Sequence, residues 1–197
     1  MRYKPEHKQA TRARILAAAG KLFRSDGLAG ASVDRVMRGA GLTIGGFYGH
    51  FASKEALVAE TLRSLLQRYR AAWLGGLEEL EGAAFLDHFA RRYLTVHNRD
   101  DESGCAMPSI LSELGRSAPE VQAVLEEEVE PLFAALEARL PPQPSISPRQ
   151  RALATLSLIF GAMALARATR STALSDEFLA AARAFLGAEA AATRRSH

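Results

Sequence analysis

The stretch Gly41–Phe51 (GLTIGGFYGHF) brings four glycines together with two phenylalanines, a tyrosine and a histidine. Glycine lets a backbone approach a ligand closely, and the tyrosine and histidine tips form hydrogen bonds, so the stretch is suited to contact phosphates or bases. A nucleotide P-loop is disfavoured because both the spacing G-x-x-x-x-G-K-[ST] and a preceding strand are missing. The letters GFYG fit the GXXG clamp of KH-type RNA-binding proteins, but that fold needs a sheet. A hinge without a ligand does not account for the basic and hydrogen-bonding residues around the glycines.

Basic residues are concentrated in the same part of the chain. Residues 1–54 contain ten Lys or Arg and three Asp or Glu, whereas the remainder contains fifteen and nineteen, and the net charge is +3. Clustered cations favour a polyanion, because binding releases the counterions condensed on nucleic acid. An ordinary solvated surface is the alternative explanation.

Apolar residues recur at helical spacing along nearly the whole chain, and no segment alternates as a strand would. The pattern predicts an all-α protein of about nine helices. Ser117 with Glu120 fits a capping box, Ser147 with Pro148 fits a helix start, and Ser175 fits the cap of the last helix. The expected ranges are about 7–25, 32–41, 43–51, 53–75, 83–97, 105–115, 118–140, 148–168 and 175–193.

The expected helix over 43–51 depends on packing. Ile44, Phe47 and Phe51 share one face, which we expect to pack on the first helix, while the three glycines after Thr43 point elsewhere. Glycine inside a helix costs about 0.5–1 kcal/mol relative to alanine, so this helix cannot stand alone. Its bare outer backbone would be able to approach the floor of a major groove.

The segment Thr11–Leu62 resembles the DNA-binding domain of the TetR/AcrR family of transcriptional regulators. The agreement extends over about fifty residues and includes the apolar helix over Ile15–Phe23, the DG at its exit, a cap before Val33 and Val36, the GLT turn, FYGHF, and Lys54 with Leu57. The resemblance implies a three-helix helix-turn-helix domain over residues 1–52, and a helical ligand-binding and dimerisation domain over residues 53–197. It further implies a repressor that binds a palindromic DNA operator as a dimer and is released by a small-molecule inducer.

The same resemblance implies which residues meet DNA. Ile44 stands where relatives often carry a basic or polar residue, and Gly46 and Gly49 stand where they often carry a side chain, so base readout from this helix is expected to be sparse. Specificity would then depend also on Ser32, Arg38, an arm at Arg2 and Lys4, and DNA shape. The predicted DNA-binding set is Ser32, Arg38, Thr43, Ile44, Gly45, Gly46, Tyr48, His50 and Lys54.

The resemblance implies dimerisation through the last two long helices, near 148–168 and 175–193. The first of them is apolar all round, with small residues Ser157, Gly161 and Ala164, which is typical of a helix covered on every side. The core of a monomer is the alternative. Aromatic residues of the second domain are predicted to line the inducer cavity, with a polar anchor among His88, Arg92 and His97. The predicted ligand-binding set is Tyr69, Trp73, Phe89, Arg92, Tyr93, His97, Cys105, Met107 and Phe160.

Cys105 is the single cysteine, which excludes an intramolecular disulfide. It lies just before an expected helix start, where a thiol pKa can be lowered, so sensing of oxidants or electrophiles is one hypothesis, and a small buried core residue is the other. His88 and His97 do not have metal-ligand spacing, and no cofactor is expected.

The chain is predicted not to be an enzyme, because its serines fall at helix caps and Cys105 has no partner base nearby in the sequence. An all-helical transferase and a protein–protein adaptor are the alternative classes. The N-terminus lacks the apolar run of a signal peptide, which predicts a cytoplasmic protein. The uncharged run Ala152–Ala166 has fifteen residues, fewer than the roughly 18–20 that span a bilayer, so no membrane partner is expected.

Overall fold

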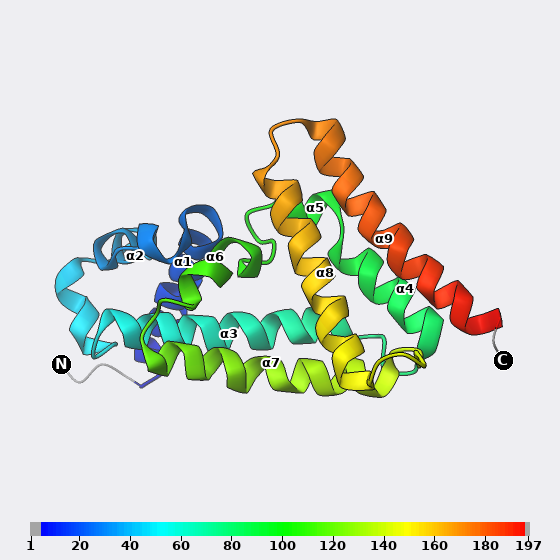
Figure 1. Cartoon of the computed structure of the whole chain (residues 1–197). Helices are drawn as coiled ribbons and strands as arrows, with labels where there is room; N and C mark the ends of the chain where they lie inside the picture. Colours follow the sequence, from blue (N-terminus) through cyan, green and yellow to red (C-terminus); the bar gives the residue numbers. More distant parts are fainter. Residues whose placement is uncertain (1–4, 196–197) are drawn as a thin grey trace. The chain divides into compact units, whose positions relative to one another are not determined.

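A computed structural model describes the backbone of residues 5–195 and the side chains of residues 6–187. Within this part the chain forms nine α-helices and one 3₁₀ helix and no strand, which confirms the all-α prediction (Figure 1). The elements are α1 (Pro5–Gly30), α2 (Val33–Gly39), η1 (Ile44–Gly49), α3 (Lys54–Leu74), α4 (Gly82–Tyr93), α5 (Val96–Asp100), α6 (Met107–Leu114), α7 (Pro119–Arg139), α8 (Pro148–Ala168) and α9 (Thr172–Arg195).

The helices form two compact units. The first comprises the chain up to Gln67 together with Ser109–Glu128, and the second comprises Arg68–Pro108 together with the chain from Val129 onward. Helices α3 and α7 each contribute to both units. The boundary after residue 52 remains a prediction about the DNA-binding segment.

In the first unit, α2 packs on α1 and η1 packs on α2. Ile15 and Phe23 of α1, Val36 of α2 and Phe47 of η1 are buried together with Met37 in this core. The N-terminal part of α7 lies beside α3. Here Glu128 accepts a hydrogen bond from Gln67 (2.8 Å) and forms an ion pair with Arg63 (3.3 Å).

Helix α1 continues past its expected end at Ser25, but it is kinked at Gly27, which has φ of 72° and ψ of −174°. The Glu113 carboxylate at the end of α6 accepts the backbone N–H groups of Leu28 (3.0 Å) and Ala29 (2.7 Å) directly after the kink. The sequence correctly places a break at this glycine. The further helical turn follows because Glu113 satisfies N–H groups that the kink releases.

We expect Gly27→Ala to lower the free energy of unfolding by about 1–3 kcal/mol, because alanine disfavours positive φ. A Cβ at this position would also clash with Glu113 Oε1, so the carboxylate would have to leave its two backbone donors. Urea denaturation followed by circular dichroism measures the change. Gly45→Ala is the control, since a Cβ there meets nothing within 4 Å. Equal stability of the two variants would contradict this role of Gly27 in the kink.

In the second unit, α9 packs against both α4 and α8, and α5 packs against α8 (Figure 1). The Arg99 guanidinium donates to Ser175 Oγ (2.8 Å) and to Asp176 (2.5 Å), which joins α5 to α9. Arg183 of α9 donates to the Leu94 carbonyl at the end of α4. Polar bonds therefore hold the helix ends while apolar faces form the core.

Three expected boundaries differ from the structure. The helix expected over 83–97 ends at Tyr93, because Thr95 caps a separate helix, α5, by accepting the N–H of Asn98 (2.9 Å). The Ser117 hydroxyl donates to the Glu113 carbonyl (3.1 Å) instead of forming the expected capping box. Helix α9 begins one turn early, at Thr172, and the Ser175 hydroxyl is buried and donates to the Ala166 carbonyl (2.6 Å).

The capping box at the start of α8 is confirmed. Ser147 Oγ accepts the Gln150 N–H (3.1 Å), the Gln150 side chain accepts the Ser147 N–H (2.8 Å), and Pro148 is the first helical residue. Among the described helices, α8 is long and apolar enough to cross a membrane, with a mean hydropathy of 1.4, and 44% of its most apolar 18-residue window is buried. The expected range of 148–168 is confirmed, and the uncharged run Ala152–Ala166, which was compared with the thickness of a bilayer, is only part of this helix.

Candidate nucleic-acid interface

Helix α2 and the turn after it are fixed by local hydrogen bonds. Ser32 caps α2 by accepting the Arg35 N–H (3.3 Å), as its residue type predicts. At the other end the Gly41 N–H donates to the Arg38 carbonyl and the Leu42 N–H to the Met37 carbonyl, both at 2.9 Å. This is a Schellman motif, and it requires the positive φ of 67° that Gly41 adopts. The turn directs the chain from α2 into η1.

The glycine-rich element is a 3₁₀ helix, not an α-helix. Its low helix propensity leaves a short, tight turn that is held by packing: Phe47 is 1% exposed, and its ring stacks on that of Phe51 with centroids 5.7 Å apart. The expectation that Ile44 packs beside them is wrong, because Ile44 is 55% exposed. Side chains tilt toward a helix N-terminus, so this first-turn residue projects over the preceding turn, away from the core.

The outer face of η1 is bare backbone with one large ring. Tyr48 is 77% exposed, and a Cβ at Gly45 or Gly49 would meet nothing within 4 Å. Gly46 is also exposed, and a Cβ there would be 3.7 Å from Met37 Cε. We define the η1 face as Thr43, Ile44, Gly45, Gly46 and Tyr48, all of them exposed.

The other predicted DNA-binding residues lie on the segments that precede and follow this face in the chain. Ser32 and Arg38 are exposed, and Arg38 forms an ion pair with Asp34 one helical turn away. An ion pair between two exposed side chains is weak, so Arg38 can exchange Asp34 for a phosphate at little cost. His50 and Lys54 are half-buried. The arm residues Arg2 and Lys4 lie outside the described residues.

His50 is held at the end of η1 by a residue that the sequence did not single out. Arg12 of α1 donates to the His50 carbonyl and pairs through two nitrogens with the Glu60 carboxylate of α3, at 2.7 Å for Nε. Its guanidinium also lies 4.2 Å from the centroid of the Phe51 ring. Burial lowers the pKa of His50, and the charges of Lys8 and Arg12 act in the same direction. His50 is therefore mainly a neutral hydrogen-bonding group near pH 7.

Lys54 opens α3, whose cap is Ser53, with Oγ accepting the Ala56 N–H at 3.1 Å. The pKa of Glu55 is lowered by hydrogen bonds from the backbone N–H of Glu55 itself and from the Ser53 side chain, and by the charge of Lys54. The Lys54 ammonium stands at the positive end of a 21-residue helix, where an anion is favoured. This placement suits the predicted phosphate contact.

The predicted ligand-binding aromatics gather in the second unit. Trp73 stacks on Tyr69 with centroids 5.4 Å apart and meets Tyr93 and Phe160 edge-on at 5.0 and 6.0 Å. We call these four residues the aromatic cluster. Phe89 instead stacks on Phe85 (5.8 Å), and Met107 is fully buried. The ligand-binding roles remain predictions.

The expected polar anchors lie elsewhere. Arg92 is exposed and donates to the carbonyls of Ala72, Trp73 and Gly75 (2.5 Å for the last), which caps the end of α3. His88 and His97 are exposed. Cys105 is only 2% exposed, an environment typical of a small core residue.

The polar groups that lie beside the aromatic cluster are not the expected anchors, and their role was not predicted from the sequence. The Tyr69 hydroxyl accepts the Ala106 N–H (2.9 Å), and Asn98 Oδ1 accepts the Cys105 N–H (2.8 Å). Arg167 donates to the Cys105 and Asn98 carbonyls, both at 2.7 Å. A lone arginine near the end of the apolar helix α8 was the available signal for this network.

Comparison with known proteins agrees with this architecture. Residues 15–61 match the family model described as bacterial regulatory proteins, tetR family. The chain is 30% identical over 118 residues to the HTH-type transcriptional regulator UidR of Escherichia coli K12, which covers 60% of this chain and 58% of UidR. It is 38% identical over 78 residues to the HTH-type transcriptional repressor KstR2 of Mycobacterium tuberculosis, which covers 36% and 39%.

The likeness in structure extends over nearly the whole chain. A TetR transcriptional regulator from Chloroflexus aurantiacus superposes with a TM-score of 0.70 at 25% identity, over 93% of this chain and 95% of that one. The matched N-terminal segment contains α2, η1 and the start of α3, the elements that form the η1 face and its surroundings. The chain is therefore similar to the tetR family of bacterial regulatory proteins, in sequence over residues 15–61 and in fold over nearly its whole length.

Proposed function

We propose that the protein is a ligand-responsive transcriptional repressor of the cytoplasm, which binds a palindromic DNA operator as a homodimer. The exposed η1 face is the observation that carries this proposal. It presents bare backbone and Tyr48 outward, while Phe47 is buried behind it. Such a surface fits a major groove, which is wide enough to admit a helix and allows its backbone to lie close to the DNA.

The charges around the η1 face support DNA as the partner. Arg38 and Lys54 flank it in the sequence. Arg12 donates to the His50 carbonyl and Arg14 to the Ala40 carbonyl, in the turns after and before η1. Since the face has few side chains for base readout, phosphate contacts and DNA shape carry much of the affinity.

Exposed apolar stripes on α8 and α9 support a homodimer. On α8 the stripe consists of Leu153, Ser157, Gly161 and Leu165, spaced four residues apart, and all are exposed. On α9, Leu174 is 45% and Phe185 57% exposed. Apolar stripes on two adjacent helices are typical of a self-complementary interface.

The aromatic cluster supports the inducer site. Its rings and the neighbouring Tyr69 hydroxyl, Asn98 and Arg167 combine a large apolar surface with a few polar groups, as small-molecule sites do. The matched relatives are named as regulators, one of them a repressor, and not as enzymes.

Duplex binding tests the proposal. A duplex selected by the purified protein from a random pool is expected to contain two inverted half-sites, and its affinity is expected to fall steeply as salt rises. Lys54→Ala should weaken binding and reduce the slope of log affinity against log salt by about one, the loss of one phosphate contact. Fluorescence anisotropy of a labelled duplex measures both.

Arg91→Ala is the matched control, because Arg91 is an exposed cation on α4, paired with Asp87 (2.8 Å), away from the η1 face in the chain. It should leave affinity and slope unchanged. If no selected duplex binds at low salt, the DNA-binding proposal fails.

A further inference from the structure

The two ring nitrogens of His50, at the end of η1, are in different surroundings. Nδ1 is shielded from solvent and makes no hydrogen bond to any described residue, although His50 as a whole is half-buried. A hydrogen on Nδ1 would therefore be a buried N–H without an acceptor, which is unfavourable. This arrangement favours the neutral imidazole that carries its hydrogen on Nε2, so the Nε2–H group is the donor that a partner can use.

The charges around His50 favour the same neutral form. Burial is the main cause that lowers the pKa of His50, and the positive charges of Lys8 and Arg12, both on α1, act in the same direction. On the other side, Glu60 of α3 pairs with Arg12, at 2.7 Å for Nε, so its negative charge is already compensated. The structure gives His50 no carboxylate partner among the described residues that would stabilise a cation.

Arg12 also fixes the position of His50, because it joins three elements. From α1, its guanidinium donates to the His50 carbonyl at the end of η1 and pairs with Glu60 of α3. The same group lies 4.2 Å from the centroid of the Phe51 ring. A lysine could not make these contacts together, since it has a single ammonium in place of a planar fork. The site therefore depends on an arginine and not only on a positive charge.

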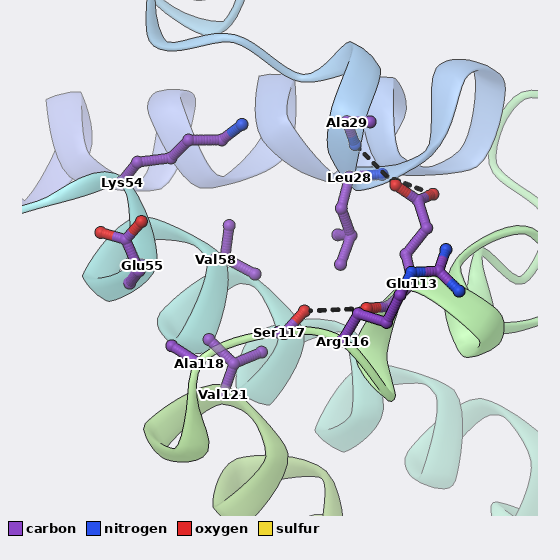
Figure 2. Close-up of a pocket in the computed structure, with 10 residues that line it drawn as sticks. All are labelled: Leu28, Ala29, Lys54, Glu55, Val58, Glu113, Arg116, Ser117, Ala118 and Val121. Atoms are coloured by element: carbon purple, nitrogen blue, oxygen red, sulfur yellow. Dashed lines mark hydrogen bonds between the residues drawn. The ribbon is translucent and has the colours of Figure 1, made fainter.

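Lys54, the next predicted phosphate contact along the chain, is of another kind. Figure 2 shows its side chain extended, with the ammonium apart from the Glu55 carboxylate. A phosphate bound by this full charge releases a counterion from the DNA, so the contact weakens as salt rises. A neutral donor can bond a phosphate oxygen without that release. The two kinds of contact can therefore be told apart by their dependence on salt.

We propose that His50 binds a DNA phosphate as a neutral Nε2–H donor, and that Arg12 is the positioning residue that holds it in this state. The inference rests on the proposed function, in which η1 meets DNA. It means that the contact at the end of η1 takes up no proton when DNA binds. Recognition at this point then depends on where Arg12 places the donor and not on a charge of His50.

NMR of the histidine ring nitrogens tests the state of His50 without DNA. Its signals, identified by their loss in His50→Gln, should show a hydrogen on Nε2 and none on Nδ1 near pH 7. Arg12→Gln removes a charge that opposes protonation, so His50 should titrate at a higher pH in this variant. Lys21→Gln is the control, since Lys21 is an exposed cation of the same helix that does not act on His50. A hydrogen on Nδ1 near pH 7, or an unchanged titration in Arg12→Gln, would overturn the proposal.

Anisotropy of the selected duplex tests the contact itself. His50→Phe keeps a ring without a donor and should weaken binding about tenfold, whereas His50→Gln keeps an amide donor and should weaken it about threefold. Neither variant should change the slope of log affinity against log salt, which Lys54→Ala reduces by about one. Between about pH 6 and 8, where an ordinary histidine titrates, the wild type and His50→Gln should have the same pH profile.

A cationic contact would give different results. Wild-type affinity would rise, relative to His50→Gln, by up to about tenfold per unit as the pH falls, and His50→Phe would have a smaller salt slope. Either result, or normal affinity in His50→Phe, would overturn the proposal. Arg12→Lys keeps the charge without the planar fork and should weaken binding about fivefold; normal affinity would end the positioning role. If no duplex binds at all, the proposed function fails, whereas the NMR experiment still decides the state of His50.

Discussion

Replacing Phe47 by alanine is expected to lower the free energy of unfolding by about 3–5 kcal/mol and to abolish duplex binding. Phe47 is 1% exposed and stacks on Phe51, and its ring meets that of Tyr48 edge-on with centroids 5.2 Å apart. Because η1 is a short 3₁₀ helix with three glycines, it has little stability of its own, and loss of this ring would release the η1 face. Urea denaturation and duplex anisotropy measure the two effects.

Tyr48→Ala is the matched control for Phe47→Ala, since it truncates the neighbouring aromatic residue on the opposite side. Tyr48 is 77% exposed, so its removal should change the free energy of unfolding by less than about 0.5 kcal/mol. Duplex affinity should nevertheless fall, because an exposed ring on the η1 face is available only to a partner. Normal duplex affinity in Tyr48→Ala would remove this residue from the predicted DNA-binding set.

Local signals in the sequence correctly predicted the elements that position the η1 face. Ser32 caps α2, and Gly41 adopts the positive φ that the turn needs, because each of these features depends on a few adjacent residues. Burial of Phe47 and Phe51 also follows from their spacing. The exposure of Ile44 could not be predicted from its spacing. Helical periodicity gives the face on which a side chain lies, but it does not show whether a neighbouring helix covers that part of the face.

Contacts between residues distant in the chain could not be predicted in this way. Arg12 was counted as one more basic residue, yet it pairs with Glu60, 48 positions away, and stacks on Phe51. Glu113 and Leu28 are 85 positions apart, so nothing near either of them indicates their hydrogen bond. The boundaries at Thr95 and Ser175 were missed for a related reason: serine and threonine suit both caps and interhelical bonds, and the tertiary structure decides between them.

Gly161→Arg is expected to convert the proposed homodimer to a monomer. A Cβ at Gly161 meets nothing within 4 Å, so the monomer can accept the larger side chain, and replacing a helical glycine favours the helix by up to about 1 kcal/mol. In a dimer that packs the α8 stripe against a partner, however, the same arginine would place a charge at the centre of an apolar contact, which is strongly unfavourable. Light scattering after size-exclusion chromatography measures the molar mass.

Ala123→Arg provides the control for Gly161→Arg, because Ala123 is an exposed residue of α7 and receives the same side chain outside the α8 stripe. It should leave the molar mass of a dimer unchanged. A helix-turn-helix monomer contacts a single half-site, whereas a dimer spans two that are about 34 Å apart, so Gly161→Arg should also lose most of its affinity for the palindrome and keep its weak affinity for one half-site. If Gly161→Arg keeps the molar mass of the wild type, the interface lies elsewhere, and the exposed apolar stripe of α8 would need another partner to cover it.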